Sequence, residues 1–459
     1  MGTCIGKKEI DQLKEGTWES LSAHMVVKKR GDKDDITGPG IIQQVKQNYF
    51  RIIIFTNCNT YEPMKDHLTR LLGDSIKLGE IMPESEYYDL VTPDGWNSER
   101  LSEPEIDYSA NTGPIYIFYT REIFTKNIRK NKKTEAGVSY VAFSEYKGYP
   151  SNKPLLHGQY FKDEGHPGMH LCAADTKIID YDFLFFVHEG DSTLRLRNNS
   201  DKKKHDDQIE FRAIEALEFV LSHPFEWNIK RVWDSEYSKV HIRLIPNRTS
   251  CYPKRPYDGT TPTEFKMYWD LYGKFLEYIL KNKEKGYCGI GNTLRNLIKL
   301  RSSEHILRAY ILALSIAIED LTVRNFAQKV QDAKREKLIL RLGDVSSEFL
   351  EKEKVPVDIA KMITEHIKRL KPSKETANRA LLRLAEEKKL IKRRVKSWKK
   401  LRNTVAHGNS MRFNQKTLNQ VGDLEVLFYQ LIFQLIGYDG KYTDYGKLGY
   451  PPKEYPKKC

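Results

Sequence analysis

The stretch EHILRAYILALSIAIEDL, from Glu304 to Leu321, determines how the second half of this 459-residue chain is expected to fold. Its apolar residues fall on nearly every side of a helical wheel, which is typical of a helix enclosed by other helices. The segments around it have helical periodicity as well, at residues 264–281, 332–352, 358–370, 374–406 and 421–436. The sequence therefore predicts an all-α C-terminal domain with residues 304–321 as its central, buried helix.

The first 250 residues have the short apolar runs and the turn residues of a β-rich domain. Strands are predicted at residues 49–56, 114–120, 138–143, 182–187 and 240–245. Turns are predicted at four clusters that contain Gly and Pro, residues 37–40, 93–95, 148–150 and 166–168. One helix, residues 208–222, interrupts the strands and ends at His223-Pro224, because proline cannot continue the helical hydrogen-bond pattern. The predicted fold class is α+β.

A change of composition predicts the domain boundary. Residues 247–263 (NRTSCYPKRPYDGTTPT) contain three prolines and one glycine, without a periodic apolar pattern. We therefore expect a β-rich N-terminal domain, a sensor or scaffold, at residues 1–250, a linker at 251–263 and the helical domain at 264–437. The remaining residues, 438–459, are rich in Tyr, Gly, Pro and Lys and are expected to be irregular.

Composition indicates a soluble, cytoplasmic protein with no cofactor and no metal. The apolar fraction is 39%, and no run of about 18 apolar residues is present, so a globular chain without a membrane span is expected. The six cysteines are scattered, with no Cys-x-x-Cys pair, which argues against a disulfide framework or a zinc site. The net charge of +14 favours a polyanionic partner such as nucleic acid, although many basic proteins have none.

Most of the excess positive charge lies in one segment. Residues 371–402 contain thirteen Lys or Arg and three Asp or Glu. A localised basic patch suits a phosphate backbone, because binding there releases counterions. The alternative is a solvated helix face without a nucleic-acid partner. The residues expected to bind RNA are Lys392, Arg393, Arg394, Lys396, Lys399 and Lys400.

Arg402 lies near the middle of the apolar stripe of this segment, which Val395, Trp398 and Val405 continue at helical spacing. A buried guanidinium needs a partner, because an isolated charge inside a protein is strongly destabilising. Glu319 is a complementary exception within the apolar run of the central helix. We therefore predict that Glu319 and Arg402 meet between the two helices; the alternative is that Glu319 reaches solvent at a helix end.

The basic segment ends in the run from Arg402 to Gly408, RNTVAHG. An all-helical domain, an acidic residue in its central helix and an Arg-Asn-x-x-x-His run together resemble the HEPN superfamily. The hallmark of that family is an arginine followed, after four to six residues, by a histidine. The resemblance covers residues 264–437. The order of a β-rich region, a helix and then such a domain is also similar to the ApeA-type proteins of bacterial anti-phage defence.

The resemblance implies a metal-independent endoribonuclease that works as a homodimer on RNA, with tRNA as one candidate substrate. The ribose 2′-OH would attack the adjacent phosphorus and leave a 2′,3′-cyclic phosphate. His407 is the expected general acid or base, because histidine exchanges protons near neutral pH. Arg402 is the expected phosphate clamp, Asn403 a positioning residue and Glu319 a further member of the site. A phage-derived trigger would act on the N-terminal domain.

Helical geometry separates the two residues of the motif. On a continuous helix Arg402 and His407 point about 140° apart, so two copies of the chain are needed to place both residues in one cleft. Other interpretations stay open at this point. His407 can be a capping or surface residue at a helix end. The domain can be a non-catalytic HEPN-like module that binds RNA or protein, or a regulator that binds DNA through its basic helix.

Overall fold

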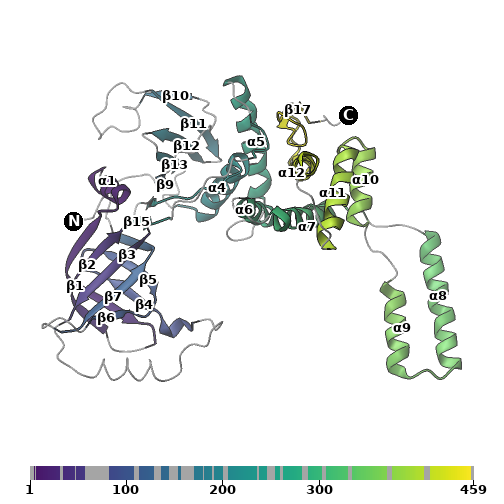
Figure 1. Cartoon of the computed structure of the whole chain (residues 1–459), viewed down its shortest axis with the longest axis horizontal. Coiled ribbons are helices and arrows are strands. Elements are labelled where there is room, and N and C mark those ends of the chain that lie inside the picture. The colour runs from purple at the N-terminus through teal and green to yellow at the C-terminus, as the bar shows by residue number, and fades with distance from the viewer. Residues whose placement is uncertain are drawn as a thin grey trace. The chain divides into compact units, whose positions relative to one another are not determined.

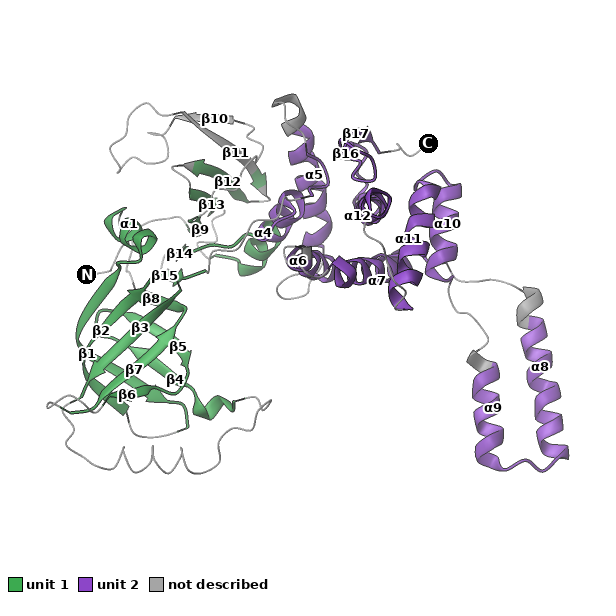
Figure 2. Ribbon diagram, viewed as in Figure 1, with its two compact units in different colours: residues 1–213, 225–250 green, residues 214–224, 251–459 purple. Residues whose placement is uncertain are grey.

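The computed structural model describes residues 5, 7–31, 35–46, 48–56, 82–107, 113–128, 136–143, 153–156, 170–178, 180–188, 191–199, 205–234, 237–245, 254–258, 262–281, 288–301, 307–328, 333–369, 375–407 and 414–455. The chain forms two compact units (Figure 2). The first comprises residues 1–213 and 225–250, and the second residues 214–224 and 251–459. The elements are labelled in Figure 1. A β-rich region precedes a helical region, so the predicted α+β fold class is confirmed.

An antiparallel sheet makes up most of the first unit. Its fifteen described strands follow the order β10-β11-β12-β13-β9-β14-β15-β8-β5-β4-β1-β2-β3-β7-β6. Their bounds are β1 Glu19–Lys29, β2 Asp35–Val45, β3 Tyr49–Phe55, β4 Tyr88–Val91, β5 Trp96–Leu101, β6 Glu105–Asp107, β7 Ile115–Thr120, β8 Glu122–Ile128, β9 Ala136–Ala142, β10 Lys153–Leu156, β11 His170–Ile178, β12 Tyr181–His188, β13 Asp191–Asn198, β14 Ile229–Trp233 and β15 Tyr237–Arg243. The helix α1 is Lys7–Glu15, and a 3-10 turn is Glu84–Glu86. The five predicted strands are confirmed as β3, β7, β9, β12 and β15.

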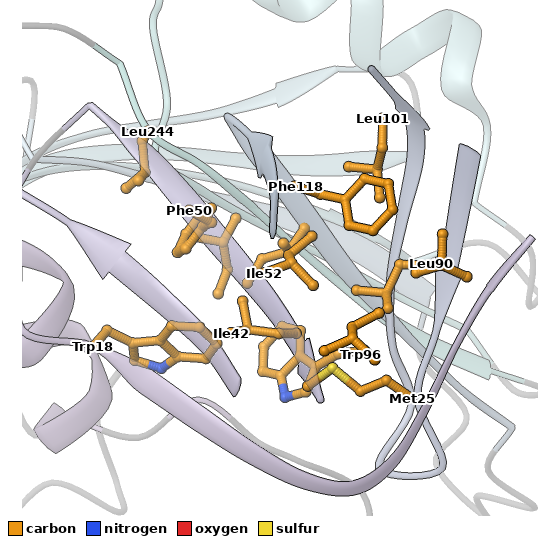
Figure 3. Close-up of a cluster of buried hydrophobic side chains, with 14 of the residues drawn as sticks. Trp18, Met25, Ile42, Phe50, Ile52, Leu90, Trp96, Leu101, Phe118 and Leu244 are labelled. Atoms are coloured by element: carbon orange, nitrogen blue, oxygen red, sulfur yellow. The ribbon is translucent and has the colours of Figure 1, made fainter. Parts of the chain in front are cut away.

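The main apolar core of this unit lies between its early strands (Figure 3). Strand β3 shows how the sequence builds it, because Phe50, Ile52 and Ile54 alternate along the strand and all three are fully buried. Trp18 and Trp96 meet edge to face in this core, with ring centroids 5.2 Å apart. Such a pair adds roughly 0.5–1.5 kcal/mol beyond its buried area.

The Gly38-Pro39-Gly40 cluster, predicted as a turn, lies inside strand β2, so that prediction is wrong. The glycines allow strand β3 to come close, since a Cβ on them would lie 2.0 or 2.3 Å from a β3 carbonyl oxygen. Pro39 has no amide hydrogen to donate. It stands opposite a bulge in β1, between Ser22 and Met25, where the regular pairing of the two strands is interrupted.

The other predicted breaks have different outcomes. The turn at residues 93–95 is confirmed, with Gly95 at φ 91° and its amide donating to the Thr92 carbonyl at 3.0 Å. The clusters at residues 148–150 and 166–168 lie outside the described residues. The helix predicted before His223-Pro224 is α4 (Asp207–Leu221), and it contributes residues to both units, since the division falls after Ala213.

The second unit is helical. Its helices are α5 Pro262–Leu280, α6 Gly289–Arg301, α7 Leu307–Asn325, α8 Ala333–Lys352, α9 Val357–Arg369, α10 Ala377–Glu386, α11 Lys392–Ala406 and α12 Gln415–Ile436. Every residue of α12 from Val421 to Phe433 is buried, and α5, α7 and α11 pack against this helix. Helix α12 is therefore the central one, and α7 is not: Ile316 on α7 is 55% exposed. Among the helices within the described ranges, none combines the length and apolarity needed to cross a membrane.

The long basic helix predicted at residues 374–406 is two helices, α10 and α11. Between them Lys388 takes a left-handed conformation with φ 58°. The amide of Leu390 donates to the Leu384 carbonyl at 3.2 Å, which closes the end of α10. Leu390 is buried, and the Tyr455 hydroxyl donates to a carbonyl in this break at 3.1 Å. Tertiary contacts therefore stabilise a break that contains neither glycine nor proline.

The segment 438–459, predicted to be irregular, contains a strand pair, β16 (Lys441–Thr443) and β17 (Pro452–Glu454). Four of its five tyrosines are buried. The predicted linker also packs in this unit. Tyr257 is buried, and the amide of Thr443 donates to the Pro256 carbonyl at 3.0 Å. The described parts of these two segments, residues 254–258 and 438–455, therefore belong to the packed fold of the second unit.

Candidate functional site

Helix α11 carries its exposed positive charge on one face. At about 100° per residue, four lysines of α11, one asparagine and the histidine that follows the helix fall within an arc of roughly 100°. All of them are exposed: Lys392, Lys396, Lys399, Lys400, Asn403 and His407. We call this set the lysine face. It brings five of the residues predicted for binding or catalysis to one surface, together with the proposed histidine.

Arg394, predicted to bind RNA, does not belong to this surface. Its side chain is 0% exposed, so it cannot reach a nucleic acid. The guanidinium donates to Asp444 at 2.8 Å, and the Tyr442 hydroxyl lies 3.3 Å away. This prediction is corrected: Arg394 anchors α11 to the strand pair, and a buried pair of this kind is strongly destabilised when one partner is removed.

Arg393 is only partly available to an external partner. It is half exposed, and its guanidinium donates to Asp423 on α12 at 2.7 Å. The Ser397 hydroxyl donates to the other oxygen of the same carboxylate at 2.9 Å. Asp423 is buried. Asp423 and Asp444 therefore hold the first turns of α11 on its buried side, and the lysine face is exposed on another side of the helix.

The predicted contact between Glu319 and Arg402 is confirmed. Arg402 Nε lies 2.8 Å from one carboxylate oxygen of Glu319, and its terminal nitrogen lies 3.1 Å from the other. This is the two-bond geometry in which arginine recognises carboxylates. Both side chains are 38% exposed, so the pair lies at the surface, and the predicted burial of Arg402 is wrong.

A second bond joins the same two helices one turn earlier. The indole nitrogen of Trp398 donates to the Ser315 carbonyl at 3.2 Å, and the Trp398 side chain is buried. The Arg402 guanidinium lies 5.9 Å from the centre of the Trp398 ring, which favours a cation–π contact. Arg402 is thus held by Glu319 at its end and by Trp398 along its side. Sequence reasoning placed Trp398 in the apolar stripe and missed this role.

His407 is the residue that ends α11. Its backbone has φ −92° and ψ 9°, and its amide donates to the Asn403 carbonyl at 3.1 Å, so the helix is continuous up to this point. The expected separation of about 140° between the directions of Arg402 and His407 therefore applies. Within the described ranges no hydrogen bond or ion pair joins their side chains. Gly408, expected to let the chain turn, lies outside those ranges.

Helix α7 has an exposed apolar side that sequence reasoning missed. Its apolar members lie on one side of the helix and are exposed or partly exposed, with the exposed Asp320 among them: Ala309, Leu312, Ala313, Ile316 and Val323. We call this set the Ile316 face. Glu319 borders it, so it adjoins the contact with Arg402. The small side chains at Ala309 and Ala313 were the available signal, because small residues on an apolar helix permit close approach of another helix.

One group of side chains in the first unit has ligand atoms close enough for a metal ion. His205, Asp207 and Glu210 offer atoms within 4.8 Å of one another. Glu210 is already engaged, since Lys230 Nζ lies 2.6 Å and His205 Nε2 2.6 Å from its carboxylate, and Tyr140 also donates to it. Burial alone would raise the pKa of Glu210, but these donors outweigh it and lower the pKa. The Lys230 ammonium supplies the positive charge that a metal would bring.

A cavity of about 530 Å³ lies among α5, α6, α7 and α12. Cys288 and Phe428 line its apolar part, and Asp320 and Arg324 lie on its polar side. Asp320 and Arg324 form an ion pair at 2.6 Å. Burial, and then the charge of Glu215, raise the pKa of the Cys288 thiol to about 12, so it is protonated and a poor nucleophile.

Comparison with known proteins finds no matching family model, curated protein or solved structure. The likeness to the HEPN superfamily therefore depends on Arg402, Asn403, His407 and their helical setting.

Proposed function

We propose that this protein is a metal-independent endoribonuclease of the HEPN type, acting as a homodimer in the cytoplasm as part of bacterial defence against phage. The observation that carries the proposal is the lysine face. Four exposed lysines lead along α11 to an exposed asparagine and an exposed histidine at the end of the helix. Arg402 directly precedes Asn403 in the helix, and its guanidinium is held by Glu319.

The residue types support the chemistry. Lysines along one face match a phosphate backbone, which they bind with release of counterions. Histidine is the side-chain type suited to general acid–base catalysis, so His407 of one copy can take the proton of the ribose 2′-OH. The 2′-oxygen then bonds to phosphorus, the bond to the 5′-oxygen breaks, and a second His407 gives that oxygen a proton. Arg402 stabilises the charge that builds on the phosphate oxygens.

The Ile316 face supports a dimer. Ile316 is 55% exposed on a helix that is otherwise mostly apolar, and exposed apolar patches mark interaction sites. Glu319 borders this face, so pairing there would bring two Glu319–Arg402 contacts near one two-fold axis. Such an arrangement would supply the second copy that the 140° separation of Arg402 and His407 requires.

A second candidate function is a non-catalytic module that binds RNA. The observation that favours it is the Glu319–Arg402 pair, since Glu319 occupies one of the two-donor edges of the guanidinium, the edge formed by Nε and one terminal nitrogen. In the catalytic proposal, substrate binding has to displace Glu319 or use the remaining donors of the guanidinium.

The test is cleavage of total tRNA by the full-length protein in EDTA, with end-group analysis of the products. His407→Ala is the informative variant, and His24→Ala is its matched control, because both histidines are exposed. We expect the wild-type protein and His24→Ala to release fragments with 2′,3′-cyclic phosphate and 5′-OH ends, and His407→Ala to release none. Cleavage by His407→Ala at the wild-type rate would overturn the catalytic assignment.

Binding separates the two candidate functions. If no variant cleaves and all bind tRNA equally, the non-catalytic module is supported and the enzyme is not. Ile316→Arg adds a test of the dimer, because a charge on the Ile316 face opposes pairing. We expect this variant to lose cleavage while it keeps its thermal stability, since the side chain is exposed.

A further inference from the structure

Helices α8 and α9 form a hairpin with a narrow inner face. Ile339 and Leu350 on α8 are its buried members, and Ile363 and Ile367 on α9 are partly buried. The turn between the helices has Lys354 at φ 49°, and the amide of Val355 donates to the carbonyl of Leu350 at 3.1 Å. The short connection makes the two helices antiparallel neighbours. Two helices alone enclose little apolar surface, so most of the apolar side chains remain outside this contact.

The apolar residues left outside lie in stripes. On α8 the spacing of four, three and four residues places the members on one line along the helix. They are Leu338, Leu342, Val345 and Phe349, exposed by 64%, 46%, 65% and 59%. On α9 the corresponding residues are Ile359 and Met362, exposed by 42% and 55%.

Both stripes lie on the same side of the hairpin. The stripe on α8 precedes the buried side of α8 by about 100° of helical rotation, and the stripe on α9 precedes the side of α9 that carries Ile363 and Ile367 by about 90°. Right-handed helices that run in opposite directions turn in opposite senses when viewed from one end. The two offsets therefore point to one common side, which we call the hairpin face. Asp344, Ser347 and Glu351 of α8 lie on the opposite side.

The apolar area of the hairpin face is large for a surface that is exposed to solvent. Six side chains at these exposures present on the order of 600 Å² of apolar surface, at the upper end of the largest patch on a typical soluble monomer. A standard protein interface buries about 800 Å² on each partner. The hairpin face, together with its charged edges, is therefore about as large as the surface that one partner contributes to such an interface.

Its edges indicate which partner fits. Arg341, Glu348 and Lys352 lie along the outer edge of α8, with Lys352 nearest the turn, and Asp358 and Glu365 lie along the outer edge of α9. A two-fold axis parallel to the helices would place α8 of one copy over α9 of the other. Lys352 of one copy would then lie at the level of Asp358 of the other, and every neighbouring pair of helices would be antiparallel, as in up-and-down four-helix bundles. A partner of uniform charge would match only one edge.

We propose that the hairpin face binds the same face of a second copy of this chain, forming an intermolecular four-helix bundle. Leu338, Leu342, Val345 and Phe349 would fill its core with Ile359 and Met362 of the second copy. The inference does not depend on the ribonuclease proposal. The bundle would supply a contact between copies that is separate from the Ile316 face.

The test is sedimentation equilibrium of the full-length protein in the Ile316→Arg background, which leaves the hairpin as the interface under study. Val345→Glu is the informative variant, because it places a charge in the hairpin face. Leu340→Glu is its matched control: Leu340 is 56% exposed and points about 140° away from Val345 and about 170° away from the mean direction of the α8 stripe. We expect Leu340→Glu to associate as the background protein does, and Val345→Glu to associate at least about tenfold more weakly.

The charged edges provide a second measurement. Lys352→Glu and Asp358→Lys should each weaken association, and the double variant should restore it, because the opposite charges are exchanged between the edges. Equal association of Val345→Glu and Leu340→Glu would overturn the proposal, as would a background protein that stays monomeric at every concentration. Cleavage of tRNA, measured on Val345→Glu without Ile316→Arg, tests the ribonuclease proposal separately.

Discussion

Arg402 on α11 and Glu319 on α7 are joined by two hydrogen bonds, one turn beyond the bond between the Trp398 indole and the Ser315 carbonyl. Both donors are four residues apart on α11, and both acceptors are four residues apart on α7. The two helices therefore run in the same direction where they touch, with matching spacing. The motif arginine is placed by this match between helices and not by the local sequence of α11 alone.

The coupling between Arg402 and Glu319 should be small but measurable. A double-mutant cycle with Arg402→Ala and Glu319→Ala is expected to give about 0.5–1 kcal/mol, because the pair is two-bonded but lies at the surface. The free energy of unfolding in urea provides the measurement. The exposed pair Asp320–Arg324 on the same helix is the control and should give less. A coupling near zero would mean that Glu319 does not hold Arg402 in solution.

Removal of the charge should destabilise the protein strongly at Arg394 and hardly at all at Lys396. Arg394→Met leaves Asp444 buried without its guanidinium, so we expect a loss of about 3–5 kcal/mol in the free energy of unfolding. Lys396→Met removes an exposed charge and should change stability by less than about 0.5 kcal/mol. Chemical denaturation of the two variants distinguishes them. Similar stabilities would contradict the anchoring role of Arg394.

The lysine face predicts a defined salt dependence of RNA binding. Lys399→Ala should weaken tRNA binding in EDTA and lower the slope of log affinity against log salt by about 1, since one phosphate contact is lost. Lys361→Ala, an exposed lysine on α9, is the control and should leave the slope unchanged. Filter binding of the His407→Ala protein over a series of salt concentrations avoids cleavage during the measurement. An unchanged slope in Lys399→Ala would remove this lysine from the interface.

Two glycines inside helices should show opposite effects on substitution by alanine. A Cβ on Gly422 of α12 would lie 2.0 Å from the Tyr445 carbonyl oxygen, so Gly422→Ala should destabilise the protein by roughly 2–4 kcal/mol. Gly273 of α5 has nothing within 4 Å of that position. Gly273→Ala should therefore stabilise it by about 0.5–1 kcal/mol through helix propensity. The measurement is the thermal unfolding temperature of the two variants. A Gly422→Ala variant as stable as the wild-type protein would contradict the close packing of the Tyr445 segment against α12.

Cys288 should resist alkylation in the native protein. Its pKa is raised from 9.0 to about 12, so the thiol stays protonated over the range where an ordinary cysteine becomes a thiolate. The stability that this group contributes is present below pH 9.0 and is lost as the pH rises towards 12. Iodoacetamide labelling near pH 8, read by mass spectrometry of the Cys288 peptide, should be slow in buffer and fast in guanidinium chloride. Rapid labelling of the folded protein would contradict the raised pKa.

Local patterns were sufficient for much of the fold. Phe50, Ile52 and Ile54 alternate in the sequence as they do in the core, and the bond between α7 and α11 follows from an acidic residue, Glu319, within the apolar run of α7. The turn at Gly38-Pro39-Gly40 was predicted wrongly because a strand neighbour, absent from the local sequence, explains these residues. The break at Lys388 was missed for the same reason, since Tyr455 contacts it from 66 residues away along the chain.

The site shows a similar limit. The basic composition of α11 identified the helix, but composition does not tell which charges face solvent. Lys396 and Arg394 are two residues apart and read alike in the sequence, yet one is exposed and the other is fully buried. Burial of Arg394 depends on Asp444, which lies 50 residues further along the chain. The Ile316 face could not be predicted, because residues 304–321 are apolar on nearly every side of the helix. Only the packing of the other helices shows which side of α7 is exposed to solvent.

The contact between Arg394 and Asp444 has a consequence for the timing of synthesis. Polypeptides are made at about 5–20 residues per second and fold progressively as they emerge. The 50 residues between the two partners therefore delay the anchoring of α11 by several seconds after its own residues have been joined. During that interval the basic helix lacks the carboxylate that holds it. The lysine face would therefore be held in place only after the ribosome has added the strand pair β16–β17, residues 441–454.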